Sequence, residues 1–152
     1  MGTLSTETEV ILKDAGWQAG RRIAPAYWIS VLESEGFAAH SAAVSFLSEF
    51  GDLQLKPAML HGKQICPDAV FLDPVRAASG ERDRVVAWEA RYQIELFPVG
   101  EVQGGAMLCC SPAGQFVLGI LTHLQYLGAG AADALNQLAC GNRQFPNFPY
   151  PG

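Results

Sequence analysis

Apolar and polar positions in the first fifty residues follow helical spacing and predict three short helices. The first has a capping box at Thr6–Glu9, continues through the apolar run Val10–Leu12 and ends at Gly16. The second has Pro25 in its first turn and Gly36 as its stop. Its apolar positions recur every three or four residues; they are Tyr27, Trp28, Val31 and Leu32.

The third helix repeats this arrangement, with Ser41 as the expected N-cap and Gly51 as the stop. Its apolar face consists of Ala43, Phe46, Leu47 and Phe50. After Gly51 the pattern changes to brief apolar or alternating runs, which predict strands at 53–60 and 69–72. A polar connection is expected to begin at Asp73 and Pro74.

Helical spacing returns from Arg82 to about Ile94 and predicts a fourth helix there. Three strands are then expected at 95–101, 104–110 and 115–121. A tight turn through Pro112 and Gly114 would join the last two strands as an antiparallel pair.

The carboxy-terminal part predicts a final helix over Asp133–Cys140, closed by Gly141, with Leu135 and Leu138 facing inward. The sequence FPNFPYPG at 145–152 is too rich in proline for a helix, so we expect it to be extended or mobile.

The order of elements indicates the fold class. Helices and strands come in separate groups with short hairpin connections, which is typical of an α+β fold. We therefore expect an antiparallel sheet packed by several short helices in a single domain at 1–141. Residues 142–152 would form a Pro/aromatic C-terminal tail.

Length and composition favour a folded, soluble chain. The 152 residues are 49% hydrophobic and 16% charged, which suffices for a core without disulfides or metals. No apolar run reaches the ~20 residues that cross a membrane. The first ten residues lack the basic and apolar regions of a secretion signal. We expect a cytoplasmic protein that does not contact membranes.

The charge balance bears on possible partners. The net charge is −5, from 10 basic and 15 acidic residues, and the pair Arg21 and Arg22 is the longest basic cluster. Direct nucleic-acid binding is disfavoured because it needs a basic face, whereas a basic protein partner would suit this charge. The four cysteines, which we expect to be reduced because they show no C-x-x-C spacing, are Cys66, Cys109, Cys110 and Cys140.

Residues with catalytic chemistry are few. His61 and Cys66 are five positions apart, and Glu101 lies in the glycine-rich stretch PVGEVQGG. Cys66 or Glu101 with a nearby histidine would suit a small cytoplasmic hydrolase or transferase, which stays an alternative. No third orienting residue, metal-ligand spacing or phosphate-binding loop accompanies them. We therefore predict no catalytic residue, metal or cofactor.

Four acidic residues are candidates for contact with a partner. Glu33 and Glu35 are at the end of the second helix, Asp52 follows the third, and Glu101 is in the glycine-rich stretch. They could form a negative surface that selects a basic partner. They could also be ordinary solvated residues. Arg21 and Arg22 could instead pair internally with the acids at the two helix ends, which are Glu33, Glu35, Glu49 and Asp52.

Several segments, in this order, resemble the SUKH superfamily of immunity proteins, specifically its third bacterial subgroup. They are LKDAGWQAGRR, LESEGF, FLSEFGDL, ICPD, FLDP, LFPVGEVQGGAMLCCSPAGQFV and LGAGAADALNQLACG, and they span roughly residues 8 to 141. The resemblance implies an α+β fold and a non-enzymatic intracellular antidote that binds a cognate toxin domain, often a nuclease or deaminase. The glycines around Glu101 would then serve bends and close packing, and Glu101 would be a rim acid. An interaction module without a toxin is a further alternative.

Overall fold

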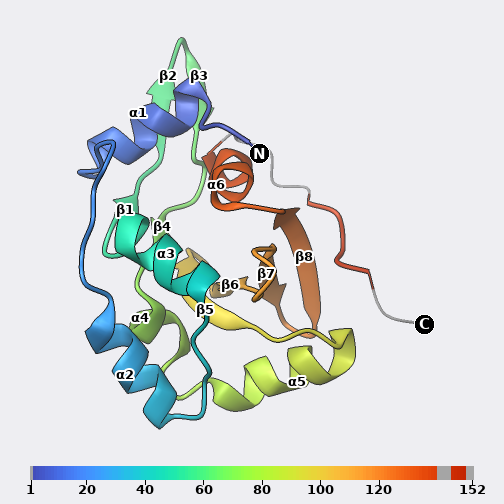
Figure 1. Ribbon diagram of the computed structural model, residues 1–152. Coiled ribbons are helices and arrows are strands. Elements are labelled where there is room, and N and C mark those ends of the chain that lie inside the picture. Colours follow the sequence, from blue (N-terminus) through green and yellow to red (C-terminus); the bar gives the residue numbers. More distant parts are fainter. Residues whose placement is uncertain (1, 140–144, 150–152) are drawn as a thin grey trace.

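The computed structural model describes residues 2–139 and 145–149 (Figure 1). Its first half contains α1 Thr6–Asp14, α2 Ala26–Ser34, α3 Ser41–Phe50, β1 Gln54–Leu55, β2 Ala58–Leu60, β3 Lys63–Ile65 and β4 Val70–Phe71. Its second half contains α4 Pro74–Ala78, α5 Arg82–Tyr92, β5 Phe97–Val102, β6 Ala106–Cys110, β7 Phe116–Ile120, β8 His123–Gly128 and α6 Ala131–Ala139.

The main sheet has six strands in the order β1-β4-β5-β6-β7-β8, and every neighbouring pair is antiparallel. Strands β2 and β3 form a separate hairpin that projects beyond α1 (Figure 1). Helices and strands are grouped rather than alternating, so the predicted α+β class with an antiparallel sheet in a single domain is confirmed.

Helices cover both faces of the sheet. In Figure 1, α5 lies below strands β5–β8, α6 lies above β7 and β8, and α3 lies in front of the sheet, while α1 lies beside α6 and β1. The helix α3 brings Phe46 against Phe116 of β7, with ring centroids 5.0 Å apart. Both faces are therefore buried, which explains why β6 and β7 are apolar almost throughout rather than alternating.

The three predicted amino-terminal helices are confirmed, but two of the caps lie one residue earlier. Ser5, not Thr6, caps α1, because its Oγ accepts the N–H of Thr8 at 3.1 Å. His40, not Ser41, caps α3 in the same way through its ring. In both helices the capping residue has extended backbone and stands just outside the first helical residue, as an N-cap must.

The middle of the chain differs more from expectation. The predicted strand at 53–60 is two strands, β1 and β2, separated at Lys56 and Pro57. The expected polar connection after β4 is the helix α4, in which Asp73 accepts the N–H of Arg76 at 3.0 Å and Pro74 takes the first position. The strand β8 and the β2–β3 hairpin were not predicted.

The fourth predicted helix is α5. It ends at Tyr92 because Gln93 has a left-handed backbone with φ of 54°. Helix α6 was predicted to begin at Asp133 and begins at Ala131, with Leu135 and Leu138 buried as expected. The predicted end of this helix at Cys140, and its stop at Gly141, lie outside the described residues.

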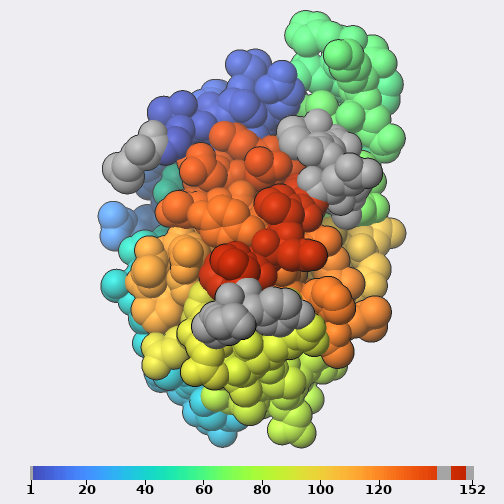
Figure 2. Space-filling view, turned by 90° about the vertical axis from the view of Figure 1, so that its right-hand side faces the viewer, coloured from blue at the N-terminus to red at the C-terminus, as the bar shows by residue number. Residues whose placement is uncertain are grey.

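The described part of the carboxy-terminal segment, residues 145–149, is extended, as predicted. It lies along β8, with Pro146 accepting from the Tyr126 N–H at 2.7 Å and Phe148 donating to the Leu124 carbonyl at 2.8 Å. Figure 2 shows this segment, in red, against the orange strand β8. The segment therefore covers an edge strand that would otherwise present unpaired backbone groups. The boundary at 141/142 stays a prediction.

No helix within residues 2–139 and 145–149 has the length and apolar character that a membrane span requires.

Candidate functional site

Glu101 is the penultimate residue of β5, opposite Phe71 of β4. Its Oε2 is 3.5 Å from Nε of Arg76 on α4, and its side chain is 25% exposed. The guanidinium of Arg76 also stacks on the ring of Phe71, 3.8 Å from the centroid. Glu101 is thus a half-buried acid held between a sheet and a helix.

The glycines around Glu101 serve geometry. A Cβ atom on Gly100 would come within 2.7 Å of the Phe71 carbonyl oxygen, so only glycine permits β4 and β5 to approach this closely. Gly104 and Gly105 have φ of 103° and 97° in the turn to β6, a backbone region that disfavours other residues. These positions match what the family resemblance implied.

Glu35 has structural partners at the carboxyl end of α2. Its carboxylate accepts hydrogen bonds from the Gly80 N–H and the Ser79 hydroxyl, both at 2.8 Å. The Gly80 bond and then the Ser79 bond lower the pKa of Glu35 from its ordinary value, because both favour the charged form. Glu33, on the same helix end, is exposed and forms no ion pair within the described part of the chain.

Asp52 lies elsewhere, directly after α3. It is exposed with φ of 69°, and it lines an open groove of about 430 Å³ beside α1 together with Asp14 and Lys56. Its N–H donates to the Leu72 carbonyl at 2.8 Å. The four candidate acids therefore do not converge on one cluster, because two contact the α4 segment and Asp52 lies beside α1.

The alternative that Arg21 and Arg22 pair with the acids at the helix ends is not seen, because neither arginine forms an ion pair among the described residues. Arg21 donates instead to the backbone carbonyl of Glu49 at 2.7 Å, and the Trp17 indole N–H donates to the Glu49 carboxylate at 3.2 Å. These bonds fix the segment after α1 to the end of α3.

The structure keeps His61 and Cys66 apart. His61 is exposed in the turn between β2 and β3, whereas Cys66 is fully buried beyond the other end of β3. The Cys66 thiol donates to the Asp68 carbonyl at 3.4 Å, and its backbone N–H donates to the Ala139 carbonyl at 2.8 Å. This arrangement suits a core residue that joins two segments.

Cys109 and Cys110 are free thiols on β6 with no exposed surface. Burial raises the pKa of Cys109 far above its ordinary value and that of Cys110 to about 12. Because the thiolate is the nucleophile, both are poorly suited to covalent catalysis at neutral pH.

His40 is occupied by the fold. Its Nδ1 accepts the N–H of Ala43 at 3.2 Å, so Nε2 carries the proton and donates to the Cys110 carbonyl at 3.0 Å. His40 therefore joins α3 to β6 rather than serving as a base. In the part of the chain that the structure describes, no three His, Cys, Asp or Glu residues are grouped in a way that could hold a metal ion.

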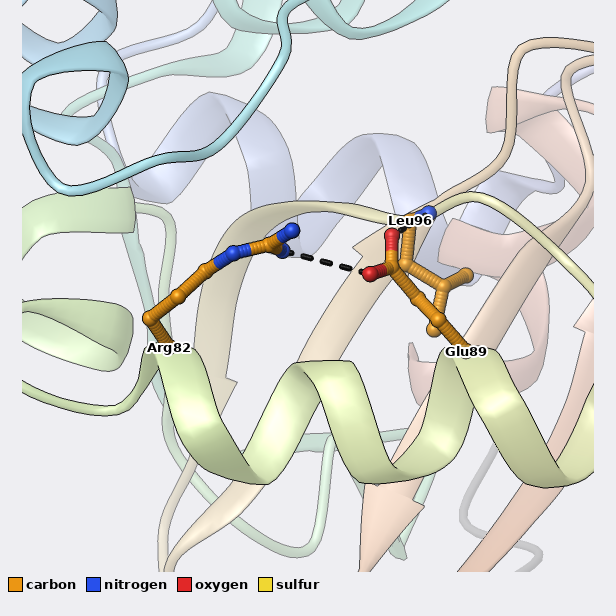
Figure 3. A network of polar contacts seen from close by, with 3 residues as sticks. All are labelled: Arg82, Glu89 and Leu96. Carbon is orange, nitrogen blue, oxygen red and sulfur yellow. Dashed lines mark hydrogen bonds and ion pairs between the residues drawn. The ribbon is translucent and has the colours of Figure 1, made fainter.

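One polar network was not expected from the sequence. Glu89 on α5 lies 3.3 Å from Nη1 of Arg82 and accepts the Leu96 N–H at 2.9 Å (Figure 3). Arg82 also lies over the ring of Phe37, 4.9 Å from the centroid. The sequence places Arg82 and Glu89 two turns apart on one face of the helix, so their pairing could have been predicted. The hydrogen bond from the Leu96 N–H to Glu89 could not. The network fixes the connection from α5 to β5.

The fold and these contacts define a single-domain α+β protein in which Glu35, Glu101, His40 and the three described thiols make internal contacts or are buried, whereas Glu33 and Asp52 remain exposed. The model of the SUKH-3 immunity protein family matches residues 4–141, nearly the whole chain. The chain belongs to this family of immunity proteins. Comparisons with curated proteins and with solved structures found no match.

Proposed function

We propose that this chain is a non-enzymatic, cytoplasmic immunity protein that neutralises a cognate polymorphic toxin by stoichiometric binding. The family match over residues 4–141 carries the proposal. The toxin we expect is a nuclease or a nucleobase deaminase, because the family resemblance implies these classes.

The chemistry of the described residues supports a binding role. Cys109 and Cys110 are buried and protonated at neutral pH. Glu101 is paired with Arg76, and His40 is used by a helix cap and a carbonyl. A nucleophile, a base and an orienting group are not assembled at one place in this part of the chain.

Charge supports the expected kind of partner. The chain carries −5, and the exposed Glu33 and Asp52 have no ion-pair partner among the described residues. A toxin that acts on nucleic acid exposes a cationic substrate channel, which attracts an acidic protein and not another polyanion. Direct nucleic-acid binding by this chain is therefore not part of the proposal.

Co-expression tests the proposal. The cognate toxin domain should stop cell growth when it is expressed alone. Co-expression of this chain should restore growth, and calorimetry should show a 1:1 complex. Cys66→Ala and Glu101→Gln, which remove the groups of the hydrolase or transferase alternative, should each protect within a few-fold of wild type. Loss of protection by a variant that folds and still binds the toxin would favour the enzyme instead.

A further inference from the structure

Leu121, in the turn between β7 and β8, combines two unfavourable features. Its φ is 53°, a region that a bulky side chain rarely adopts, and it is 80% exposed. Glycine or asparagine would relieve the backbone, and a polar residue would suit the solvent. The fold gains nothing visible from leucine here, and such unexplained strain is concentrated at functional positions.

A side chain of α5 fixes the turn that contains Leu121. The indole N–H of Trp88 on α5 donates to the Leu121 carbonyl at 2.8 Å. Arg84, one turn earlier on α5, donates from Nη2 to the Gly105 carbonyl at 3.1 Å and lies 5.0 Å from the Trp88 ring centroid. One helix thus fixes two neighbouring turns, β7–β8 and β5–β6.

A groove of about 300 Å³ lies beside these two turns. Its described apolar lining comes from β5, β6, β7, the β7–β8 turn and the carboxy-terminal segment: Val102, Ala106, Leu118, Ile120, Leu121 and Phe145. Gln103 and Gln125 are its uncharged polar side chains. Ile120 is 36% exposed, so it extends the apolar surface around Leu121. Arg84 is the only charged side chain among the described residues that line the groove. A guanidinium has five N–H donors, so the bond to Gly105 leaves donors for a further acceptor.

We propose that this groove is a docking site for the toxin domain, which would place an apolar side chain against Leu121 and Ile120 and a carboxylate beside Arg84. The inference rests on the proposed function. The exposed apolar side chains and the single guanidinium of the groove are complementary to an apolar side chain and a neighbouring carboxylate on the toxin. Because α5 already fixes both turns before binding, less conformational entropy is lost when the complex forms. Interface hot spots are enriched in arginine and lie in well-packed, desolvated pockets, and a partner side chain seated in this groove would desolvate Arg84 in that way.

Leu121→Gly separates binding from folding, because glycine accepts φ of 53° without strain. Its melting temperature should stay within about 4 °C of wild type or rise, which corresponds to a small change for a chain of this size. Its Kd for the toxin domain, measured by calorimetry, should weaken roughly ten-fold or more, as expected for loss of a central apolar contact. Leu121→Asn, which also tolerates this backbone, should behave alike.

Controls use apolar residues that are exposed elsewhere. Tyr27→Ser on α2 and Met59→Gln on β2 remove side chains that are 70% and 66% exposed, and neither should change the Kd by more than about two-fold. Arg84→Gln should weaken binding mainly through faster dissociation, because it removes a charge from a desolvated contact.

The outcomes are distinguishable. If both Leu121 variants bind the toxin as tightly as wild type does, the groove is not the docking site, whereas the proposed function stands. Wild type that fails to bind the toxin would overturn both. If sedimentation showed wild-type dimers that Leu121→Gly dissociates, with toxin affinity unchanged, the groove would belong to a second copy of this chain and the inference would be wrong.

Discussion

The indole ring of Trp88 lies directly over Gly119, in the space that a Cβ atom at residue 119 would fill. Trp88 is 1% exposed and is the largest of the fully buried side chains in the described residues. Gly119 therefore permits α5 to pack closely on β7. Its role is to leave space for a ring, because its own φ is not in the left-handed region.

Gly119→Ala should destabilise the protein by roughly 1–3 kcal/mol, because the added methyl group overlaps a ring that cannot move freely in a packed core. Urea unfolding followed by fluorescence measures this change. Gly130→Ala is the control, since no atom lies within 4 Å of a Cβ atom there and its φ is outside the left-handed region. A Trp88→Phe change removes the overlapping ring atoms, so the two substitutions together should cost less than their sum. Additive effects would contradict the steric explanation.

The sequence predicted elements that carry local patterns and missed those that do not. Ala43, Phe46 and Phe50 lie three and four residues apart in a ten-residue helix, so periodicity was sufficient there. Helix α4 has five residues, too few to show a period, and only Asp73 and Pro74 indicated its start. The β8 strand was missed because Leu121 stands in the turn before it, where a glycine or asparagine is expected.

The candidate acids could be chosen from the sequence, but their contacts could not. Glu35 meets Ser79 and Gly80, and Glu101 meets Arg76, across distances in the chain that local patterns do not connect. Such pairs arise when α4 packs between α2 and β5. The groove at Leu121 could not be predicted from the sequence for the same reason, since four separate segments of the chain line it.

Cys109 and Cys110 should resist alkylation in the folded protein. Burial raises the pKa of both thiols, so the reactive thiolate is scarce and the sulfur atoms are covered. With iodoacetamide at pH 8, peptide mapping should find both unmodified in native buffer and modified in urea without reductant. Rapid native modification of either would show that β6 is accessible. Protein taken from cytoplasm should show four modified cysteines in urea, and two or none would contradict the predicted reduced state.

His40→Ala should destabilise the protein by about 2 kcal/mol or more, because it removes the N-cap of α3 and leaves the Cys110 carbonyl without this donor. His40→Asn should cost less, since asparagine can still accept the Ala43 N–H. Ser41→Ala is the control: the sequence suggested Ser41 as the cap, and the structure predicts a change within about 0.5 kcal/mol. Equal losses for His40→Ala and Ser41→Ala would contradict the assignment of the cap. Thermal unfolding at pH 7.5 gives the comparison.

Glu35→Gln should lower stability at neutral pH and have less effect in acid. The pKa of Glu35 is lowered in the fold, so its carboxylate adds stability above the ordinary value of 4.5, and this contribution is lost as the pH falls through the lowered folded value. Melting temperatures of wild type and Glu35→Gln should therefore converge between pH 6 and the lowest pH at which both fold. Glu33→Gln, on the same helix end without such partners, should differ little from wild type throughout. A gap that widens in acid would refute the role of the two hydrogen bonds.

Exposed acids should govern how fast the toxin is captured, whereas the Leu121 groove should govern how slowly it is released. Glu33→Lys and Asp52→Lys are the cleaner reversals, because reversing Glu35 or Glu101 would also break contacts with Ser79, Gly80 or Arg76.

The Glu33→Lys, Asp52→Lys double variant should associate roughly ten-fold more slowly at low salt, with little change in dissociation. The difference should shrink at 1 M salt, where the Debye length is about 3 Å. Glu95 is exposed in the segment after α5, so the single reversal Glu95→Lys controls for the general effect of net charge. Stopped-flow rates against ionic strength measure all of these. If the double variant associates as fast as wild type at every salt concentration, Glu33 and Asp52 lie outside the encounter surface. If Glu95→Lys slows capture as much as either single reversal does, the whole charge of −5 attracts the partner and no local acidic surface is needed.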